Sequence, residues 1–297
     1  MLHIKRTFIL GLLFLIALVS NAQQTEVQAA YTFLQQGDLD KSKAAIDAAV
    51  LHIETAEDAQ AWYVRGFVYK EIYKQKEKTN KQSPMRLEAL NSFKKSLSLD
   101  KSDENVQENI KNIKYLATTL FNDAKDCLDD VDYKIAIVDF DKFIEYYALV
   151  DSSPVNIQQR KIEFNLAIAS VYTKIFESDK QTKLDFLSLA KSTYSKVLDV
   201  EPNNISANYN MGILYYNQAV NLINQSDYDL DIVALSDIQD NSIKLFKESL
   251  PFMEKAYSLD PKRRETLLGL SGIYFSLNEF EKSNSFKLKL EEIEKQK

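Results

Sequence analysis

The sequence predicts an all-α fold, an α-solenoid in which helix hairpins stack in series, and three observations support this. With 6 Gly and 5 Pro among 297 residues, the chain has few of the residues that a β-rich fold needs for tight turns. At 45% hydrophobic and 27% charged, it is apolar enough to fold and, past its first segment, too charged for a membrane protein. Segments of similar pattern recur along the chain, as in proteins built from stacked repeats.

The first 22 residues have the features of a signal peptide. Lys5 and Arg6 precede an apolar run over residues 8–19, and Ser20-Asn21-Ala22 supplies small residues for cleavage. Because a membrane-spanning helix needs about 20 apolar residues, an uncleaved anchor is the weaker alternative. We therefore expect a signal peptide over 1–22 and a mature chain over 23–297, exported to the periplasm of a Gram-negative bacterium or secreted. No Cys near the cleavage point could accept a lipid.

Charge and cysteine content narrow the function classes. Removing residues 1–22 lowers the 37 Lys and Arg to 35 against 43 Asp and Glu, a net charge of −8. Such an acidic chain is not expected to bind nucleic acid, because that affinity rests on Lys and Arg neutralising phosphates. Cys127 is the sole cysteine, so we expect a buried thiol and no internal disulfide. His52 is the only His after residue 22, which leaves no His-rich metal site.

Two segments share one motif. AQAWYVRGFVY at 59–69 places Gly66 four residues after Trp62 and three before Tyr69, the spacing W-x2-L-G-x2-Y. ISANYNMGILY at 205–215 repeats this half with Gly212 and Tyr215.

The other half of the motif follows further along the chain. Ala89 lies four residues before Phe93, the spacing A-x3-F, and Pro202 and Pro261 stand where helices must end. Over nearly all of its mature length the chain therefore resembles the tetratricopeptide repeat family. The resemblance implies a right-handed superhelix of about six helix-turn-helix units, with approximate bounds 23–56, 57–103, 104–150, 156–204, 205–263 and 264–297.

Close packing of paired helices requires a small residue in each helix where the two cross. The six candidate pairs are Ala30 and Ser42, Gly66 and Ala89, Ala124 and Ala136, Ala169 and Ala190, Gly212 and Ser249, and Ser271 and Ser283. Three pairs are twelve residues apart, and the others are 23, 21 and 37 apart. We expect longer helices beside polar loops at 76–84 and 177–183, and a solvated cap or loop within 225–249.

The 225–249 insertion contains alternating acidic residues. Asp227, Asp229 and Asp231 alternate as in calcium loops, but the sixth position lacks Gly and Ile238 occupies the twelfth, so calcium is not expected. Pro251 is expected to kink its helix or to mark the helix start.

The sequence predicts no enzyme, no catalytic residue, no cofactor and no metal site. Carboxylates fall at helical spacing from Lys, as in Lys287 to Glu291 and Glu291 to Lys295, which is typical of a solvated helix face. No Ser lies in a G-x-S-x-G motif, and no phosphate-binding pattern follows Gly66 or Gly212.

The resemblance implies that the first helices of successive units line a concave surface, with residues beside the crossing residue pointing into it. Those residues are Tyr31, Tyr63, Phe67, Lys70, Phe121, Asn122, Lys125, Tyr209, Asn210, Tyr216 and Asn217. Asn210, and less closely Asn122, match the Asn that holds the ligand backbone in peptide-binding members. Lys70 and Lys125 do not form the basic group with which members hold a C-terminal carboxylate. The alternative is that these aromatic residues belong to the core between repeats.

Three functions follow from these features. The favoured one is an exported, non-enzymatic scaffold that binds a peptide segment or partner protein in envelope assembly or secretion. A second is an accessory subunit of an outer-membrane assembly machine, which the missing lipidated Cys disfavours. The third is an enzyme or ligand-binding protein with its chemistry in the 225–249 insertion.

Overall fold

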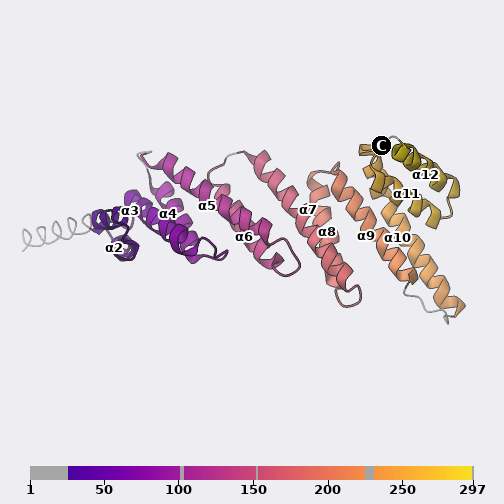
Figure 1. Ribbon diagram of the computed structural model, residues 1–297, viewed down its shortest axis with the longest axis horizontal. Helices are drawn as coiled ribbons and strands as arrows, with labels where there is room; N and C mark the ends of the chain where they lie inside the picture. Colours follow the sequence, from indigo (N-terminus) through magenta and orange to yellow (C-terminus); the bar gives the residue numbers. More distant parts are fainter. Residues whose placement is uncertain (1–25, 101–103, 152, 225–230, 296–297) are drawn as a thin grey trace, which may run out of the picture. The chain divides into compact units, whose positions relative to one another are not determined.

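The structure is a computed structural model that describes residues 26–100, 104–151, 153–224 and 231–295, and every regular element there is helical (Figure 1). This confirms the all-α prediction. The helices are residues 26–35, α2 (Leu39–Leu51), α3 (Ala59–Ile72) with its π-helical continuation η1 (Tyr73–Glu77), α4 (Pro84–Leu99), α5 (Val106–Asp126), α6 (Tyr133–Tyr147), α7 (Pro154–Ser178), α8 (Leu184–Val200), α9 (Ile205–Asn224), α10 (Ile232–Leu259), α11 (Arg264–Ser276) and α12 (Phe280–Lys295). The expected signal peptide lies outside the described residues.

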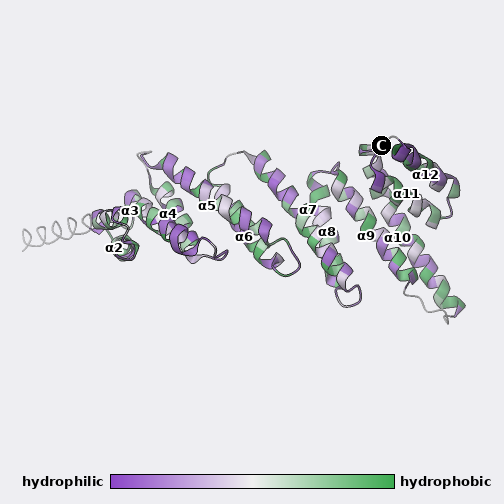
Figure 2. Cartoon of the chain, viewed as in Figure 1, coloured by the Kyte–Doolittle hydropathy of each residue, from purple (hydrophilic) through white to green (hydrophobic). Residues whose placement is uncertain are grey.

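The chain divides into two compact units. The first comprises Met1–Cys127 and Lys134–Pro154, and so contains helix 26–35, α2 to α5 and nearly all of α6. The second comprises Leu128–Tyr133 and Val155–Lys297, and contains α7 to α12. In both units consecutive helices form hairpins, and Figure 2 shows polar and apolar residues interleaved along the labelled helices. The boundaries of the six repeats stay a prediction.

Local sequence explains where the helices of the first unit begin. Asp38 and Asp58 cap α2 and α3 by accepting backbone N–H groups of the first turn. Ser83 caps α4 in the same way and is followed by Pro84, which needs no hydrogen bond at the first helical position. The turn before α2 requires Gly37, whose φ of 78° is unfavourable for other residues.

Two glycines lie where paired helices touch. A Cβ atom on Gly66 would lie 2.6 Å from ring carbons of Phe93, which belongs to the facing helix α4. A Cβ on Gly212 would lie 2.4 Å from Cγ of Met253 in α10. A side chain at either position would therefore force the facing Phe93 or Met253 to move, in agreement with the prediction that these glycines are packing residues.

A buried serine hydroxyl marks the crossing in three hairpins. In each, the serine of the second helix donates to the backbone carbonyl of the small residue in the first. These bonds join Ser42 to Ala30 (2.7 Å), Ser249 to Gly212 (2.7 Å) and Ser283 to Ser271 (2.8 Å). Three of the six predicted crossing pairs are thereby confirmed by direct contact. The bond also satisfies a hydroxyl that would otherwise be costly to bury.

The expectation of a solvated cap or loop within 225–249 is wrong from residue 232 onward. α10 begins at Ile232, with Asp231 accepting from the Ala234 N–H at 2.8 Å. Residues 232–241 are exposed or half-buried, as expected of a solvated segment, and the buried residues of α10 begin with Ser242, Phe246 and Ser249 at helical spacing. The excess residues therefore lengthen both helices of the hairpin, as at the loops after η1 and α7.

Three residues that the sequence analysis singled out in or beside this insertion are Pro251, Asp227 and Asp229. Pro251 lies inside α10 and so does not mark the start of a helix. Asp227 and Asp229 lie outside the described residues.

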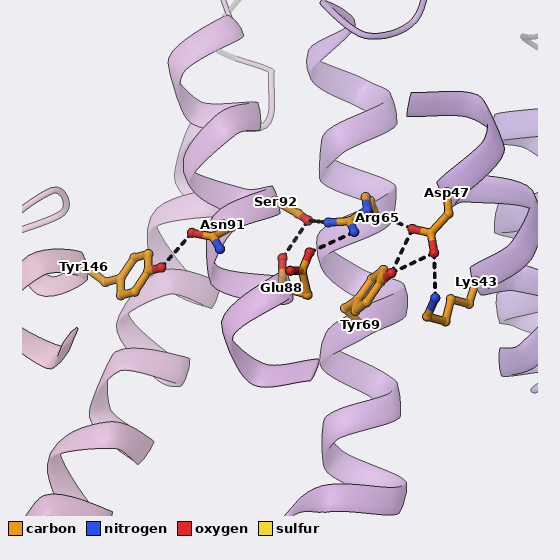
Figure 3. A network of polar contacts seen from close by, with 8 residues as sticks. All are labelled: Lys43, Asp47, Arg65, Tyr69, Glu88, Asn91, Ser92 and Tyr146. Carbon is orange, nitrogen blue, oxygen red and sulfur yellow. Dashed lines mark hydrogen bonds and ion pairs between the residues drawn. The ribbon is translucent and has the colours of Figure 1, made fainter. Parts of the chain in front are cut away.

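A polar network joins α2, α3 and α4 (Figure 3). Arg65 of α3 donates to the Asp47 carboxylate at 2.9 Å, to Ser92 at 2.7 Å and to Glu88 at 2.8 Å. The Tyr69 hydroxyl also donates to Asp47, at 2.7 Å. Because the guanidinium binds both neighbouring helices, the network fixes the orientation of α3 and of the residues on its other face.

Candidate functional site

Each unit contains a pocket between the first helices of consecutive hairpins. The N-terminal pocket, in the first unit, has a volume of about 850 Å³. Its walls come from helix 26–35 and α3, and its lining residues are Val27, Gln28, Tyr31, Leu34, Gln35, Asp58, Gln60, Tyr63, Val64 and Phe67. The C-terminal pocket, in the second unit, has a volume of about 580 Å³. Its lining residues are Tyr209, Ile213, Tyr216, Asn217, Glu265, Leu268, Gly269, Ser271, Gly272, Phe275, Ser276 and Lys287, from α9, α11 and α12.

Aromatic rings form the wall of the N-terminal pocket on α3. Tyr63 and Phe67 lie edge to face, with centroids 4.9 Å apart and planes at 64°. Behind them the buried Phe93 packs edge to face on Phe67 at 5.6 Å. Tyr31 forms the opposite wall and is 44% exposed. The rings on α3 thus contribute one side to the core and the other to the pocket.

The N-terminal pocket has little free charge. Asp58 is its one charged lining residue, and that carboxylate accepts the Gln60 backbone N–H at 3.0 Å. Burial raises the pKa of Tyr63, and the charge of Glu108 adds to this, so its phenol stays protonated. The lining therefore offers apolar surface and neutral hydrogen-bonding groups.

Lys70 is held beside the N-terminal pocket without lining it. Its Nζ lies 3.8 Å from the Phe67 ring centroid and donates to Asn112 of α5 at 2.8 Å. Burial lowers the pKa of Lys70, because a desolvated ammonium is disfavoured. The side chain thus ties α3 to α5 and covers one face of Phe67.

The C-terminal pocket is formed by close contact of α9 and α11. A Cβ on Gly272 would lie 2.9 Å from the Tyr216 hydroxyl oxygen, so this glycine lets the tyrosine lie against α11. Tyr209 is covered by the Arg263 guanidinium, 4.1 Å from its ring centroid. Leu268 and Phe275 form the apolar wall on α11 and are more than half exposed.

Opposite charges lie at the edge of the C-terminal pocket. Glu265 lines it and lies 3.6 Å from Arg263. Lys287 of α12 lines it as well, with Nζ 5.8 Å from the Phe275 ring centroid. Lys287 stands where the repeat pattern expects Phe, so this pocket has a cationic group in place of an aromatic one.

The same helix positions line both pockets. Counted from the crossing residue, they lie three residues before it and one, four and five residues after it. In helix 26–35 these are Val27, Tyr31, Leu34 and Gln35; in α9, Tyr209, Ile213, Tyr216 and Asn217; and in α11, Leu268, Gly272, Phe275 and Ser276. In α3, Tyr63 and Phe67 hold the first two of these positions. Each pocket is therefore built from the repeat itself.

The structure brings together six of the eleven residues predicted for the concave surface. Tyr31, Tyr63 and Phe67 line the N-terminal pocket, and Tyr209, Tyr216 and Asn217 line the C-terminal pocket.

The other five predicted residues lie elsewhere. Asn210 is half-buried on α9 and is not a lining residue of the C-terminal pocket, and Lys70 lies beside the N-terminal one. On α5, Phe121 packs on Phe143 at 4.9 Å, while Asn122 and Lys125 are exposed. Ligand binding by any of the eleven stays a prediction.

Sequence reasoning missed the α11 wall. The sixth unit has Leu267 in place of the motif Trp, and its pocket residues Leu268 and Phe275 attract no attention from the motif. Their distances from Ser271 match those of Tyr209 and Tyr216 from Gly212, and this register would have identified them.

No group of three or more His, Cys, Asp or Glu side chains in the described residues is arranged to hold a metal ion. None of the helices in the described ranges has the length and apolarity to cross a membrane.

No protein-family model matches the chain, and no curated protein matches it either. Solved structures similar to it include a human IFIT1 dimer with m7Gppp-AAAA, at 12% identity and a TM-score of 0.37. That match covers 90% of this chain and 50% of IFIT1, so this chain spans about half the length of IFIT1.

Two further similar structures match over most of their own length. MamA from Desulfovibrio magneticus RS-1 has 16% identity and a TM-score of 0.35, covering 78% of this chain and 97% of MamA. PilF from Pseudomonas aeruginosa has 13% identity and a TM-score of 0.33, covering 93% and 98%. The resemblance to the tetratricopeptide repeat family rests on the sequence motifs.

Proposed function

We propose that this chain, a helical repeat of the tetratricopeptide type, is a non-catalytic scaffold that binds peptide segments of partner proteins in its N-terminal and C-terminal pockets. One observation carries this proposal. In both units, the same helix positions around the crossing residue form an open pocket with aromatic and apolar walls and a few polar groups. Such a combination is typical of sites that hold a peptide side chain while polar groups orient its backbone.

We also propose that the chain is exported and that it acts in envelope assembly or secretion. They are supported by the sequence of residues 1–22, with its basic start, apolar run and small residues before the cleavage point. An accessory role in an outer-membrane assembly machine is the second candidate, and the lack of a Cys at the cleavage point weighs against it.

The C-terminal pocket offers a test with a matched control. Leu268 is 54% exposed and lines the pocket, whereas Leu288 of α12 is 52% exposed and does not line it. Peptides are first selected from a random display library on the mature chain, and their affinities are then measured for each variant. We expect Leu268→Ala to weaken the selected peptides by about 1 kcal/mol or more and Leu288→Ala to leave them unchanged.

The result has clear alternatives. Equal affinities for wild type and Leu268→Ala, together with an unchanged thermal midpoint, would remove the C-terminal pocket from the proposal. Asn210→Ala in the same assay tests the assignment from the family resemblance, and a loss there would extend the binding site along α9. Failure to select any peptide on the wild-type chain would contradict the proposed function as a whole.

A further inference from the structure

The second unit has a groove on the side of α9 that faces away from the C-terminal pocket. Two adjoining cavities of about 200 and 400 Å³ share Gln218, Leu222 and Leu245, and so form one groove, which we call the lysine groove. At 3.6 residues per turn, Gln218 and Leu222 lie on the opposite side of α9 from Ile213 and Tyr216, which line the C-terminal pocket. The lysine groove is therefore a separate surface of the same helix.

The lysine groove has an apolar end and a charged end. The walls of the smaller cavity include the apolar side chains of Phe176, Leu184 and Leu187, from α7 and α8. The larger cavity is lined by Lys191 of α8 and Lys244 of α10, with Glu248 as its one carboxylate. The groove thus combines a small apolar cavity with a larger one in which positive charge predominates.

Lys191 brings its charge into the groove without an ion pair. Its Nζ donates to Gln218 Oε1 at 2.7 Å and lies 3.6 Å from the Tyr215 ring centroid, which stabilises the ammonium. Burial lowers the pKa of Lys191, and the charge of Glu248 opposes this without forming an ion pair with it. Within the described part of the chain, Lys244 has no ion pair either.

The two amide side chains of the groove that contact lysines add donors. Gln218 Oε1 accepts from Lys191, and Asn221 Oδ1 accepts from Lys180 at 2.9 Å. Because a lysine ammonium can only donate, both amide oxygens are fixed toward lysines, and the amide N–H groups are left for other partners. The Asn221 Nδ2 is buried and has no partner among the described residues. Lys180 already pairs with Glu177 at 2.9 Å, so the unmet donors are those of Lys191, Lys244 and the two amides.

We propose that the lysine groove binds an acidic segment of a partner protein, with a carboxylate against Lys191 and Lys244 and a neighbouring apolar side chain in the smaller cavity. The inference rests on the proposed scaffold function and adds a second binding surface to it. A carboxylate supplies acceptors to both ammonium groups and offsets the cost of burying Lys191. Because the chain after residue 22 has a net charge of −8, its overall charge repels an acidic segment, and the affinity has to come from the groove itself.

The test is a fluorescence-anisotropy titration of the mature chain with two labelled, end-blocked hexapeptides, a Leu-Glu repeat and a Leu-Gln repeat. The two peptides have the same length and nearly the same shape, and they differ in charge. We expect the Leu-Glu peptide to bind at least about tenfold more tightly, because hydrogen bonds between charged groups are the stronger ones. This advantage should decrease as the salt concentration rises, since Lys244 is exposed.

Matched lysine variants locate the binding. Lys191→Gln and Lys244→Gln each remove one positive charge from the groove and should weaken the Leu-Glu peptide at least about fivefold, with little effect on the Leu-Gln peptide. Lys196→Gln changes an exposed lysine of α8 that lines neither cavity, and should affect neither peptide. Circular dichroism melts show whether the half-buried Lys191→Gln folds as the wild type does, and the exposed Lys244→Gln tests the same groove without altering buried packing.

Four other results would overturn the inference. Equal binding of the two hexapeptides would do so, as would a preference for Leu-Glu that persists in both Lys191→Gln and Lys244→Gln. Displacement of the Leu-Glu peptide by inorganic phosphate, but not by chloride at the same ionic strength, would identify a site for small anions in place of a protein segment. Binding of neither hexapeptide, while library peptides still depend on Leu268, would remove the lysine groove alone and leave the proposed function standing.

Discussion

Asp47 is a single carboxylate on which three side chains converge. Lys43 donates to it at 2.7 Å from its own helix, and Arg65 and Tyr69 donate from α3. Burial alone would raise the pKa of Asp47, but the hydrogen bonds from Lys43, Tyr69 and Arg65 outweigh burial and lower it below the usual range. The carboxylate form is therefore more stable in the folded chain than in the unfolded one.

The free energy of unfolding should therefore depend on pH and decrease as the solution becomes acidic. Since the folded pKa of Asp47 is the lower one, its contribution to stability is complete above the unfolded pKa of about 3.9 and is lost as the pH falls through the folded value. Urea unfolding between about pH 5 and 2 should show a smaller loss of stability in Asp47→Asn than in the wild type, because other carboxylates whose pKa is lowered, such as Asp38, still contribute. At pH 7, Asp47→Asn should cost about 1–3 kcal/mol, because Arg65 loses a charged partner.

The control for this experiment lies on the same helix. Asp40 of α2 is exposed and forms an ion pair with Lys76 at 2.8 Å. Asp40→Asn therefore removes an ion-paired carboxylate from the same helix and leaves the hydrogen bonds of Arg65 intact. If Asp40→Asn and Asp47→Asn gave the same acid profile, the network in Figure 3 would not be the source of the dependence.

At the scale of elements, the hairpin crossing determines how closely two helices pack. Gly212 of α9 faces Met253 of α10, and Ser249 donates to the Gly212 carbonyl at 2.7 Å. Neither contact leaves room for a larger residue, because Met253 and Ser249 are both completely buried. A larger residue at position 212 therefore tests how well the hairpin of α9 and α10 tolerates overpacking.

Gly212→Leu should destabilise the chain by about 1–3 kcal/mol, since the facing helices cannot separate without losing their own contacts. The measurement is the midpoint of urea unfolding, compared between variants whose unfolding free energy has the same dependence on urea concentration. Lys295→Ala, a change to an exposed side chain in the last turn of α12, should leave the midpoint unchanged. Identical midpoints for the two variants would mean that α9 and α10 do not cross at Gly212.

The helices could largely be predicted from the sequence, because small residues at crossings and helix-ending residues have a direct steric cause. The contact of Ser42 with the Ala30 carbonyl follows from spacing alone, whereas Gly66, which the spacing pairs with Ala89, has Phe93 of the same helix as its near neighbour. The helical conformation of residues 232–249 was not predicted, because no buried residue precedes Ser242 and the first turns of α10 lack the apolar periodicity from which a helix is predicted.

The pockets could be predicted only in part. Tyr209 and Tyr216 stood out because they flank a recognisable motif, whereas Leu268 and Phe275 lie in a unit that departs from it. Lys70 was predicted to line the concave surface, but its ammonium group donates to Asn112, which lies 42 residues further along the chain. Spacing within one repeat gives no information on such a contact.

At the scale of the whole molecule, the chain has two compact units, and each contains a pocket lined by the first helices of consecutive hairpins. The pockets differ in charge: the N-terminal one is lined by Asp58 and neutral polar groups with no cation, and the C-terminal one has Glu265 and Lys287 at its edge. We therefore expect the two pockets to prefer different segments.

Cleavage after Ala22 is a further prediction for the whole chain. The protein isolated from an envelope fraction should have an intact mass that begins at Gln23, because Ala22 and Ser20 are small enough for signal peptidase. Ala22→Leu should accumulate the uncleaved chain, whereas Ala22→Ser, which keeps a small residue, should be processed normally. A mature mass that includes Met1 in the wild type would favour the uncleaved anchor.

The crossing residues and the pocket residues of one helix differ in how much change they tolerate. The crossing residue of each hairpin is tied to a particular neighbour, as Gly212 is to Met253, and tolerates little change. Most pocket residues, such as Tyr31 and Leu268, face outward and lie only one to five residues away along the same helix. Mutation can therefore change what such a protein recognises while its scaffold stays constant, and duplicating a hairpin adds a new recognition surface whose packing is already solved.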